Sequence, residues 1–219
     1  MKKLFVLLMG LMFLAACAST TAPSKSLFLG EYENKLQAGP EGGAKLLWLK
    51  PGADFAKYNK FMVDYPVFAL APESEYKGID GDEMKTLADN ASKGLIEGIS
   101  KEYTVVSEPG PDVVRIHFGI VDLKQSSPVL SGVTSVVPIG LGISLIKKGA
   151  SDSYTGSGGT KAEVLIIDST TNEVIGAAKD EYSAGFTERF SKWGVVEDAF
   201  KHWGERIAKF LTEAKTAKK

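Results

Sequence analysis

The sequence contains little cysteine, little histidine and no excess of charge of either sign. One cysteine and two histidines occur among 219 residues. A single thiol cannot form a disulfide within the chain, so we expect the fold to depend on the burial of apolar side chains. The 26 Lys and Arg residues are balanced by 27 Asp and Glu residues. This balance leaves no basic excess to bind phosphates, so the sequence predicts no nucleic-acid partner.

Recognisable catalytic and ligand-binding motifs are also missing. His117 and His202 lie on different predicted elements without the spacing of a metal-binding motif, so no metal is expected. The chain has no G-x-S-x-G motif, and the glycines at 140–142 lack the remaining residues of a nucleotide-binding loop. No catalytic residue and no cofactor is therefore predicted. Four aspartates near the ends of predicted strands are most simply explained as solvated side chains: Asp64, Asp122, Asp168 and Asp180.

The N-terminus begins with charged residues and continues with apolar and then small ones. Lys2 and Lys3 precede an uninterrupted apolar stretch from Leu4 to Leu14, which is the pattern of a bacterial export signal. These 11 residues are too few to cross a bilayer as a helix, which takes about 20 residues. The sequence Leu14-Ala15-Ala16-Cys17 resembles the lipobox of bacterial lipoproteins. The resemblance implies cleavage before Cys17, diacylglyceryl attachment to its sulfur and a third acyl chain on the new amino terminus.

This resemblance predicts both a location and a division of the chain. In such lipoproteins an aspartate after the cysteine marks retention in the inner membrane, whereas Ala18 and Ser19 follow Cys17 here. We therefore expect acyl chains to hold the protein at the periplasmic face of the outer membrane. The small polar residues after the cysteine predict a flexible tether. The predicted divisions are a signal peptide at 1–16, a lipidated N-terminus and tether at 17–26, a single domain at 27–214 and a polar tail at 215–219.

Two long helices are indicated by capping residues and by apolar spacing. Asp80 and Glu83 form a capping-box pattern, and apolar residues then recur every three or four positions as far as Ile99. A second helix is expected after Ser191, which can cap it. Its apolar stripe consists of Val196, Phe200, Trp203, Ile207 and Leu211.

Strands outnumber helices in the prediction. Residues 113–124 alternate between apolar and polar side chains, as expected of a half-buried strand. A turn at 169–172, in which Asn172 can take a positive φ, separates the last two strands. The other strands are expected at 45–50, 61–70 with an interruption at Pro66, 103–106, 161–168 and 173–184. The order favours an α+β fold, with two main helices packed on a mixed, mainly antiparallel sheet.

Short motifs in a fixed order connect the chain with a known family. They are Phe28-Leu29, Tyr32 and Leu36; Gly39-Pro40 and Gly42-Gly43; Lys50-Pro51-Gly52-Ala53 and Tyr58; Asp64 and Val67; Gly110-Pro111 before Val113; Ala162-Glu163, Asp168 and Glu173; and Trp193, Phe200 and Trp203. The series resembles the bacterial lipoprotein family called domain of unknown function 3313 (DUF3313). The resemblance covers nearly the whole predicted mature chain. It implies an outer-membrane location and a fold, and it transfers no catalytic residue.

Two positions depart from the family pattern. Asn172 stands where the family tends to have glycine, and asparagine can adopt the same left-handed backbone at small cost. Gly204 stands where we expect alanine, and it should weaken its helix by about 1 kcal/mol.

The segment 125–146 carries no charged residue and is rich in Val, Ile, Leu, Gly and Ser. One interpretation is a crossover packed against the core. The other is an apolar surface that meets a partner protein or the membrane. The residues of that surface would be Val133, Val136, Val137, Ile139, Leu141 and Ile143.

Three functional hypotheses remain open. The first is a non-enzymatic, lipid-anchored envelope protein that binds another envelope protein or maintains the envelope. The second is a protein that binds a lipid or a cell-wall fragment between the sheet and the helices. Its pocket would be lined by Trp48, Tyr65, Phe118 or Trp203, although the simpler interpretation, which we favour, is that these aromatics fill the core. The third is an unrecognised hydrolase of envelope polymers.

Overall fold

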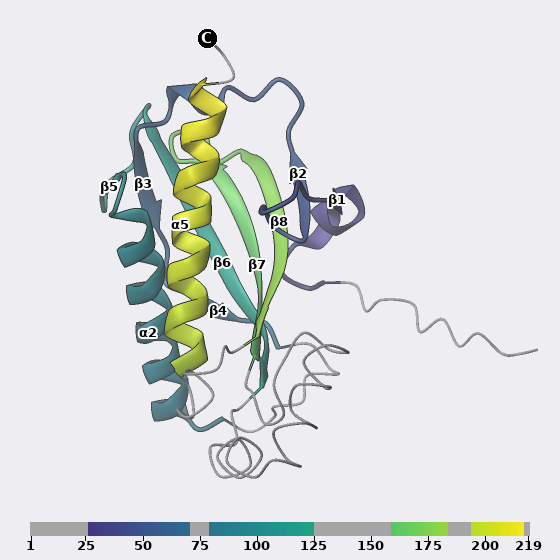
Figure 1. Ribbon diagram of the computed structural model, residues 1–219, viewed down its shortest axis with the longest axis vertical. Helices are drawn as coiled ribbons and strands as arrows, with labels where there is room; N and C mark the ends of the chain where they lie inside the picture. Colours follow the sequence, from purple (N-terminus) through teal and green to yellow (C-terminus); the bar gives the residue numbers. More distant parts are fainter. Residues whose placement is uncertain (1–25, 71–78, 125–158, 184–193, 217–219) are drawn as a thin grey trace, which may run out of the picture.

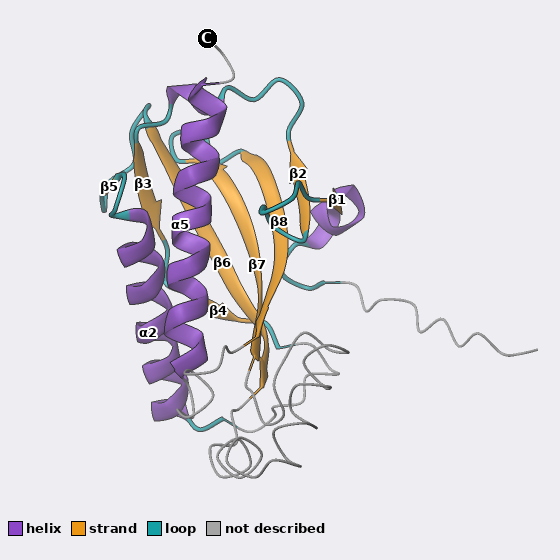
Figure 2. Ribbon diagram, viewed as in Figure 1, coloured by secondary structure: helices purple, strands orange, loops and turns teal. Residues whose placement is uncertain are grey.

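Two long helices cover one face of an eight-stranded mixed sheet (Figures 1 and 2). The computed structural model describes residues 26–70, 79–124, 159–183 and 194–216. Within these residues the helix layer consists of α2 (Gly81–Ile99) and α5 (Gly194–Thr216). Two 3₁₀ helices, η1 (Gly30–Lys35) and η2 (Phe55–Lys57), lie in the connections. The α+β prediction is confirmed.

The sheet runs in the order β1-β2-β8-β7-β6-β3-β5, with β4 also paired to β6. All pairs from β1 to β6 along this order are antiparallel, whereas β3 pairs in parallel with both β5 and β6, and β4 pairs in parallel with β6. Parallel pairing needs a long crossover connection, and α2 lies in it. The strands are β1 (Gln37–Ala38), β2 (Leu46–Leu49), β3 (Lys60–Val63), β4 (Val67–Phe68), β5 (Thr104–Val105), β6 (Val113–Lys124), β7 (Gly159–Asp168) and β8 (Val174–Ser183).

The helix ends follow the capping pattern where the structure describes them. The Asp80 carboxylate accepts a hydrogen bond from the Glu83 backbone N–H at 2.8 Å, which confirms the predicted start of α2. The predicted cap of α5, Ser191, lies outside the described residues. At its other end α5 continues through Lys215 and Thr216, the first two residues of the predicted tail.

The central strand β6 has the predicted alternation. Arg115 and His117 point to the face opposite the helices, whereas the apolar residues at the alternate positions are buried on the helix side: Val114, Ile116, Phe118 and Ile120. A bulge between Ile120 and Asp122, which the sequence did not indicate, shifts this phase, so that Leu123 also joins the core.

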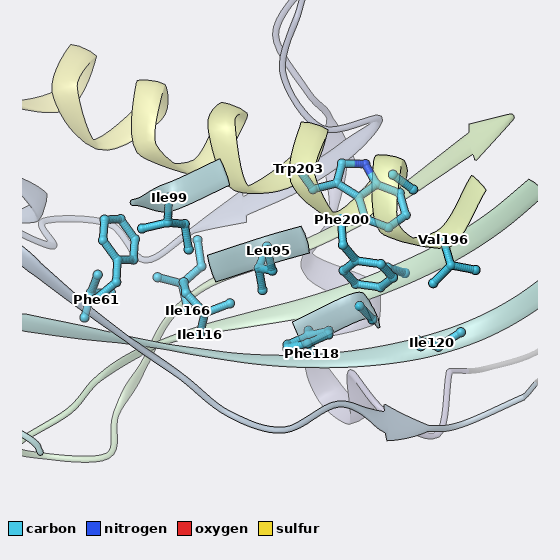
Figure 3. Close-up of a cluster of buried hydrophobic side chains, with 14 of the residues drawn as sticks. Phe61, Leu95, Ile99, Ile116, Phe118, Ile120, Ile166, Val196, Phe200 and Trp203 are labelled. Carbon is cyan, nitrogen blue, oxygen red and sulfur yellow. The ribbon is translucent and has the colours of Figure 1, made fainter. Parts of the chain in front are cut away.

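The core between the sheet and the helices combines residues from every layer (Figure 3). Leu95 and Ile99 of α2, together with Phe61 of β3, are almost completely shielded from solvent. Phe118 of β6 contacts Phe200 of α5, with ring centroids 5.2 Å apart. The apolar stripes predicted for both helices therefore face one common core.

Glycines allow α2 and α5 to approach backbone to backbone. A Cβ atom built on Gly94 would lie 2.4 Å from the carbonyl oxygen of Glu197, and one built on Gly98 would lie 2.3 Å from that of Lys201. A Cβ atom on Gly204 would lie 2.5 Å from the carbonyl oxygen of Leu95. Gly204 therefore lowers the helix propensity of α5 but also permits the close contact, because alanine there would push the two helices apart.

The N-terminal segment 26–36 covers the second face of the sheet. The Phe28 ring stacks on His117 at 5.1 Å, and the Tyr32 ring lies 5.2 Å from Trp48 of β2. Gly119 leaves room for Phe28, since a Cβ atom there would lie 2.7 Å from the Phe28 ring. This face of the sheet is therefore partly enclosed rather than open to water.

The helix contact predicts a clear difference between two glycine substitutions. Gly98→Ala should lower the free energy of unfolding by about 2 kcal/mol, because overpacking against a backbone outweighs the gain in helix propensity. Gly81→Ala is the matched control, since a Cβ atom at this first residue of α2 meets nothing within 4 Å. It should leave stability unchanged or raise it by up to about 1 kcal/mol. Urea denaturation followed by circular dichroism measures both, and equal stability of the two variants would contradict the contact.

Candidate functional site

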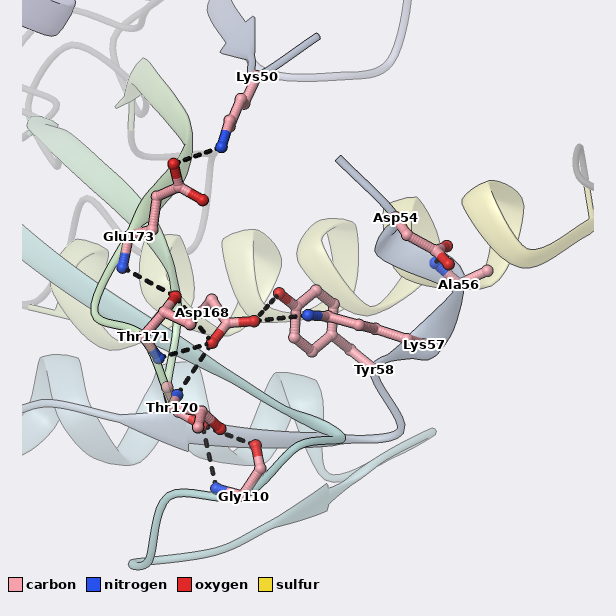
Figure 4. A network of polar contacts seen from close by, with 11 residues as sticks. Lys50, Asp54, Ala56, Lys57, Tyr58, Gly110, Asp168, Thr170, Thr171 and Glu173 are labelled. Atoms are coloured by element: carbon pink, nitrogen blue, oxygen red, sulfur yellow. Dashed lines mark hydrogen bonds and ion pairs between the residues drawn. The ribbon is translucent and has the colours of Figure 1, made fainter. Parts of the chain in front are cut away.

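Asp168 at the end of β7 is the centre of a polar network (Figure 4). The residue is 5% exposed. One carboxylate oxygen accepts hydrogen bonds from Lys57 Nζ at 2.6 Å and from the Tyr58 hydroxyl at 2.7 Å. The other accepts from the backbone N–H groups of Thr170 and Thr171 and from the Thr171 hydroxyl, at 2.9–3.1 Å. The network joins η2 to the turn between β7 and β8.

The same network fixes the charge of Asp168. Burial alone would raise its pKa, but the hydrogen bonds from Lys57, Thr171 and Tyr58 outweigh burial and hold the pKa well below its usual range. Burial, together with the hydrogen bond to Asp168, raises the pKa of Tyr58 to about 12. Asp168 thus remains a charged acceptor that connects η2 with the β7–β8 turn. The prediction that it is merely solvated is wrong, because residues distant in sequence enclose it.

The hairpin turn beside Asp168 has the predicted geometry. Asn172 has a φ of 58°, which confirms the left-handed position expected in place of glycine. Its backbone N–H donates to the carbonyl oxygen of Asp168 at 2.9 Å.

A second carboxylate, Asp64, joins two polar side chains of β6. Its two oxygens lie 2.8 and 2.9 Å from Nε of Arg115, and one of them lies 2.9 Å from Nδ1 of His117. An Asp–His pair can activate a nucleophile such as a serine hydroxyl group. Ser26 lies in the same segment as Phe28, whose ring stacks on His117. Its hydroxyl group, however, donates a hydrogen bond to Glu163 and not to His117.

The contacts of Ser26 attach the N-terminal segment to the sheet. Glu163 of β7 is 1% exposed, and it accepts the Ser26 hydrogen bond and an ion pair from Lys179 at 3.0 Å. Lys179 also lies 3.3 Å from Glu33 of η1, which accepts a hydrogen bond from the Ser26 backbone at 2.7 Å. Burial lowers the pKa of Lys179, but its two carboxylate partners outweigh burial and raise the pKa overall.

An apolar cavity of about 180 Å³ lies on the helix side of the sheet. It is bounded by α5, by strands β2, β7 and β8, and by the loop 40–44. Its apolar walls consist of Leu47, Ala162, Val164, Ile166, Ala178, Trp203, Ile207 and Phe210.

Asp180 organises the wall of this cavity. Its carboxylate accepts hydrogen bonds from Nε1 of Trp203 at 2.9 Å and from Arg206 at 2.6 Å. The backbone N–H of Lys45 donates to its other oxygen at 3.2 Å. The polar edge of the indole ring is thus satisfied. Asp180, like Asp168, is therefore held by protein partners rather than simply solvated.

The four predicted pocket aromatics do not come together. Trp203, which is 6% exposed, lines the cavity. Phe118 is a core residue with no exposed surface, and Trp48 packs on Tyr32 at the opposite face of the sheet. Tyr65 is 56% exposed, and its hydroxyl donates to Asp89 of α2.

Most residues of the cavity were not predicted to form a site, although the spacing of the apolar residues among them was a weak indication. Ile207 and Phe210 follow Trp203 on one flank of α5, and Ala162, Val164 and Ile166 alternate along β7. Periodicity identifies such residues as facing inward, but it cannot separate a cavity wall from a filled core.

The remaining predicted site residues lie outside the described residues. They are Cys17 and the apolar set Val133, Val136, Val137, Ile139, Leu141 and Ile143.

In the described part of the chain, no three side chains of His, Cys, Asp or Glu gather as metal ligands would. The helices described there are also too short or too polar to cross a membrane. His202 lies against Tyr182, with ring centroids 5.7 Å apart, and burial lowers its pKa.

Comparison with known families identifies the chain. The model of a family described as "Protein of unknown function (DUF3313)" matches residues 24–207. The chain belongs to the DUF3313 family. The match covers the sheet, α2 and most of α5, and it confirms the resemblance found in the sequence. No curated protein matches this DUF3313 chain.

Among solved structures, the DUF3313 chain is similar to two PelC dodecamers from Paraburkholderia phytofirmans, each with 11% sequence identity. The first is a variant with a TM-score of 0.39, and the alignment covers 74% of this chain and 95% of that one. The second has a TM-score of 0.36, and the alignment covers 71% of this chain and 96% of that one. A DUF4136 family protein from Bacteroides thetaiotaomicron has a TM-score of 0.29 and 10% sequence identity, and the alignment covers 77% of this chain and 95% of that one.

The Asp168 network predicts a pH-dependent loss of stability. Its pKa is lowered in the folded state, so its contribution is fully present above the unfolded value of about 3.9 and is lost as the pH falls towards the folded value. Asp168→Asn should therefore lower the free energy of unfolding by about 2 kcal/mol at pH 7. The variant should also lose less stability than the wild type between about pH 5 and pH 3.

Urea denaturation at a series of pH values measures this difference. Glu31→Gln is the control, because Glu31 is an exposed residue whose side chain pairs with Lys35 on the surface. It should follow the wild-type curve. An Asp168→Asn curve that coincides with the wild type at every pH would show that the network contributes nothing.

Proposed function

We propose that this protein is a non-enzymatic, lipid-anchored module at the periplasmic face of the outer membrane, acting in protein interaction or envelope maintenance. The observation that carries the proposal is the pattern Leu14-Ala15-Ala16-Cys17 behind an apolar leader. Acyl chains on Cys17 are the proposed attachment, and two acyl chains are enough for stable anchoring.

The short distance between anchor and fold supports this proposal. Ser26 is the ninth residue after Cys17, and nine extended residues span about 30 Å. Ser26 is bonded to the buried Glu163 of the central strand β7. A domain anchored in this way would stay close to the lipid surface, and local concentration would favour partners in the same thin layer.

The use of the carboxylates supports a role without catalysis. Asp168 joins η2 to the β7–β8 turn, Asp64 joins the segment after β3 to β6, and Asp180 joins β8 to α5. Each of these aspartates has partners that stabilise the fold.

The cavity favours one further candidate function, the binding of a small apolar ligand. Trp203 comes from the predicted pocket set, and the cavity lies between the sheet and a helix, as that hypothesis expected.

The anchor is tested by cell fractionation and mass spectrometry of protein purified from its native host. The wild type should carry three acyl chains on an N-terminal Cys17 and should sediment with the outer membrane. Cys17→Ser should carry none. Ala18→Asp is the matched variant, because an aspartate after the cysteine should leave acylation intact and move the protein to the inner membrane. A free thiol or an uncut leader in the wild type would refute the anchor.

The apolar segment 125–146 provides a test of partner binding. Changing Val136, Val137 and Ile139 to Ser should remove partners that crosslink to the wild type in intact cells, if this segment forms the proposed surface. The unfolding midpoint shows whether the fold is retained. An unchanged set of partners with an unchanged midpoint would eliminate this surface.

A further inference from the structure

The cavity beside α5 is partly open to solvent and has mainly apolar walls. We infer that it binds an aliphatic chain of about six carbon atoms, or a saturated ring of that size, attached to a head group without negative charge. This inference rests on the second candidate function and names its ligand class. The volume of about 180 Å³ exceeds the roughly 150 Å³ of an apolar cavity that stays dry and takes up benzene.

The aromatic walls of the cavity are fixed before a ligand arrives. The Trp203 indole is held by its hydrogen bond to Asp180, and it meets Phe200 edge to face, with ring centroids 4.9 Å apart. The Phe210 ring meets Phe55 edge to face at 5.3 Å. Rings held in this way lose little freedom on binding, so a small apolar ligand can gain affinity from contact alone.

Two small residues on neighbouring strands form the floor of the cavity. Ala178 of β8 lies opposite Val164 of β7, and Ala162 of β7 lies opposite Asp180. A larger side chain at either alanine would occupy the space. Because the floor and the inner walls are mostly hydrocarbon, a water molecule at the floor finds few of the two to four polar partners it needs.

The loop 40–44 forms a lip that is tied to the cavity wall. Its turn is closed by a hydrogen bond from the Gly43 backbone N–H to the Pro40 carbonyl oxygen at 2.9 Å. The backbone N–H of Lys45 donates to Asp180, which also holds Trp203. The lip and the indole wall therefore share one anchoring carboxylate.

The charges around the cavity give an anionic head group no advantage. Asp180 and Arg206 pair with each other at 2.6 Å. Lys209 lies near Glu213, at 3.7 Å, and Glu41 adds a further carboxylate at the mouth. Three carboxylates against two cations leave one net negative charge, so an anionic head group gains no attraction there.

The test uses bromine as a contact quencher of tryptophan fluorescence. The full chain, in phospholipid vesicles, is titrated with 6-bromohexan-1-ol. A variant with Trp48→Phe and Trp193→Phe keeps Trp203, and a variant with Trp193→Phe and Trp203→Phe keeps Trp48. Trp203 should be quenched with saturation, and Trp48, on the opposite face of the sheet, should not. Equal or unsaturable quenching of both would mean partitioning only and would overturn the inference.

Chain length and head charge define the ligand class further. The shorter 4-bromobutan-1-ol should bind about tenfold more weakly, because two fewer methylene groups are buried. The anion 6-bromohexanoate should bind no more tightly than the alcohol. A preference for the anion would refute the assignment of the head group.

Variants that fill the cavity locate the site. Ala178→Leu in the Trp203-only chain should abolish saturable quenching, whereas Ala38→Leu, at an exposed position of β1, should leave it unchanged. If Ala178→Leu lowers the unfolding midpoint, Ile207→Phe is the variant to use in its place, because it fills the cavity from the helix side and should also abolish saturable quenching. Quenching that survives in a folded cavity-filling variant would place the ligand elsewhere.

The inference and the proposed anchor can fail separately. If Cys17 is acylated but Trp203 shows no saturable quenching, the inference fails and the anchored module stands. If a chain with a free Cys17 shows saturable quenching, the anchor fails and the inference stands.

Discussion

The close contact between α2 and α5 sets the layout of the molecule. The two backbones can approach closely because three glycines at the contact have no side chain that would separate them: Gly94, Gly98 and Gly204. The paired helices therefore form one narrow layer, with α2 over the β3 and β5 side and α5 over β7 and β8 (Figure 1). Beyond α5, the sheet is bordered by the loop 40–44, and the apolar cavity lies between them.

Polar contacts supplement this apolar arrangement where segments distant in sequence meet. Asp168 holds η2 against the β7–β8 turn, and Glu163 holds the N-terminal segment against the second face of the sheet. Both carboxylates are almost fully buried, and both have hydrogen-bonding partners. Such contacts stabilise the connections, whereas periodic apolar residues stabilise the layers. The proposed anchor would join the molecule at the segment that Glu163 holds.

Local patterns predicted the elements well, and contacts between distant residues limited the prediction of the site. The cap at Asp80, the alternation along β6 and the backbone of Asn172 depend on neighbours in sequence, so they could be predicted. The close contact of Gly204 and the burial of Asp168 depend on residues about a hundred positions away. The four candidate aromatics are all typical core residues, and tertiary packing alone decides that Trp203 lines the cavity.

The contact between the helices can be measured directly by nuclear magnetic resonance in solution. A Cβ atom on Gly98 would lie 2.9 Å from the Cα atom of Gly204, so the Hα atoms of the two glycines must be neighbours. We predict a strong nuclear Overhauser effect between them. Its absence in the folded protein, with assigned signals for both glycines, would contradict the account.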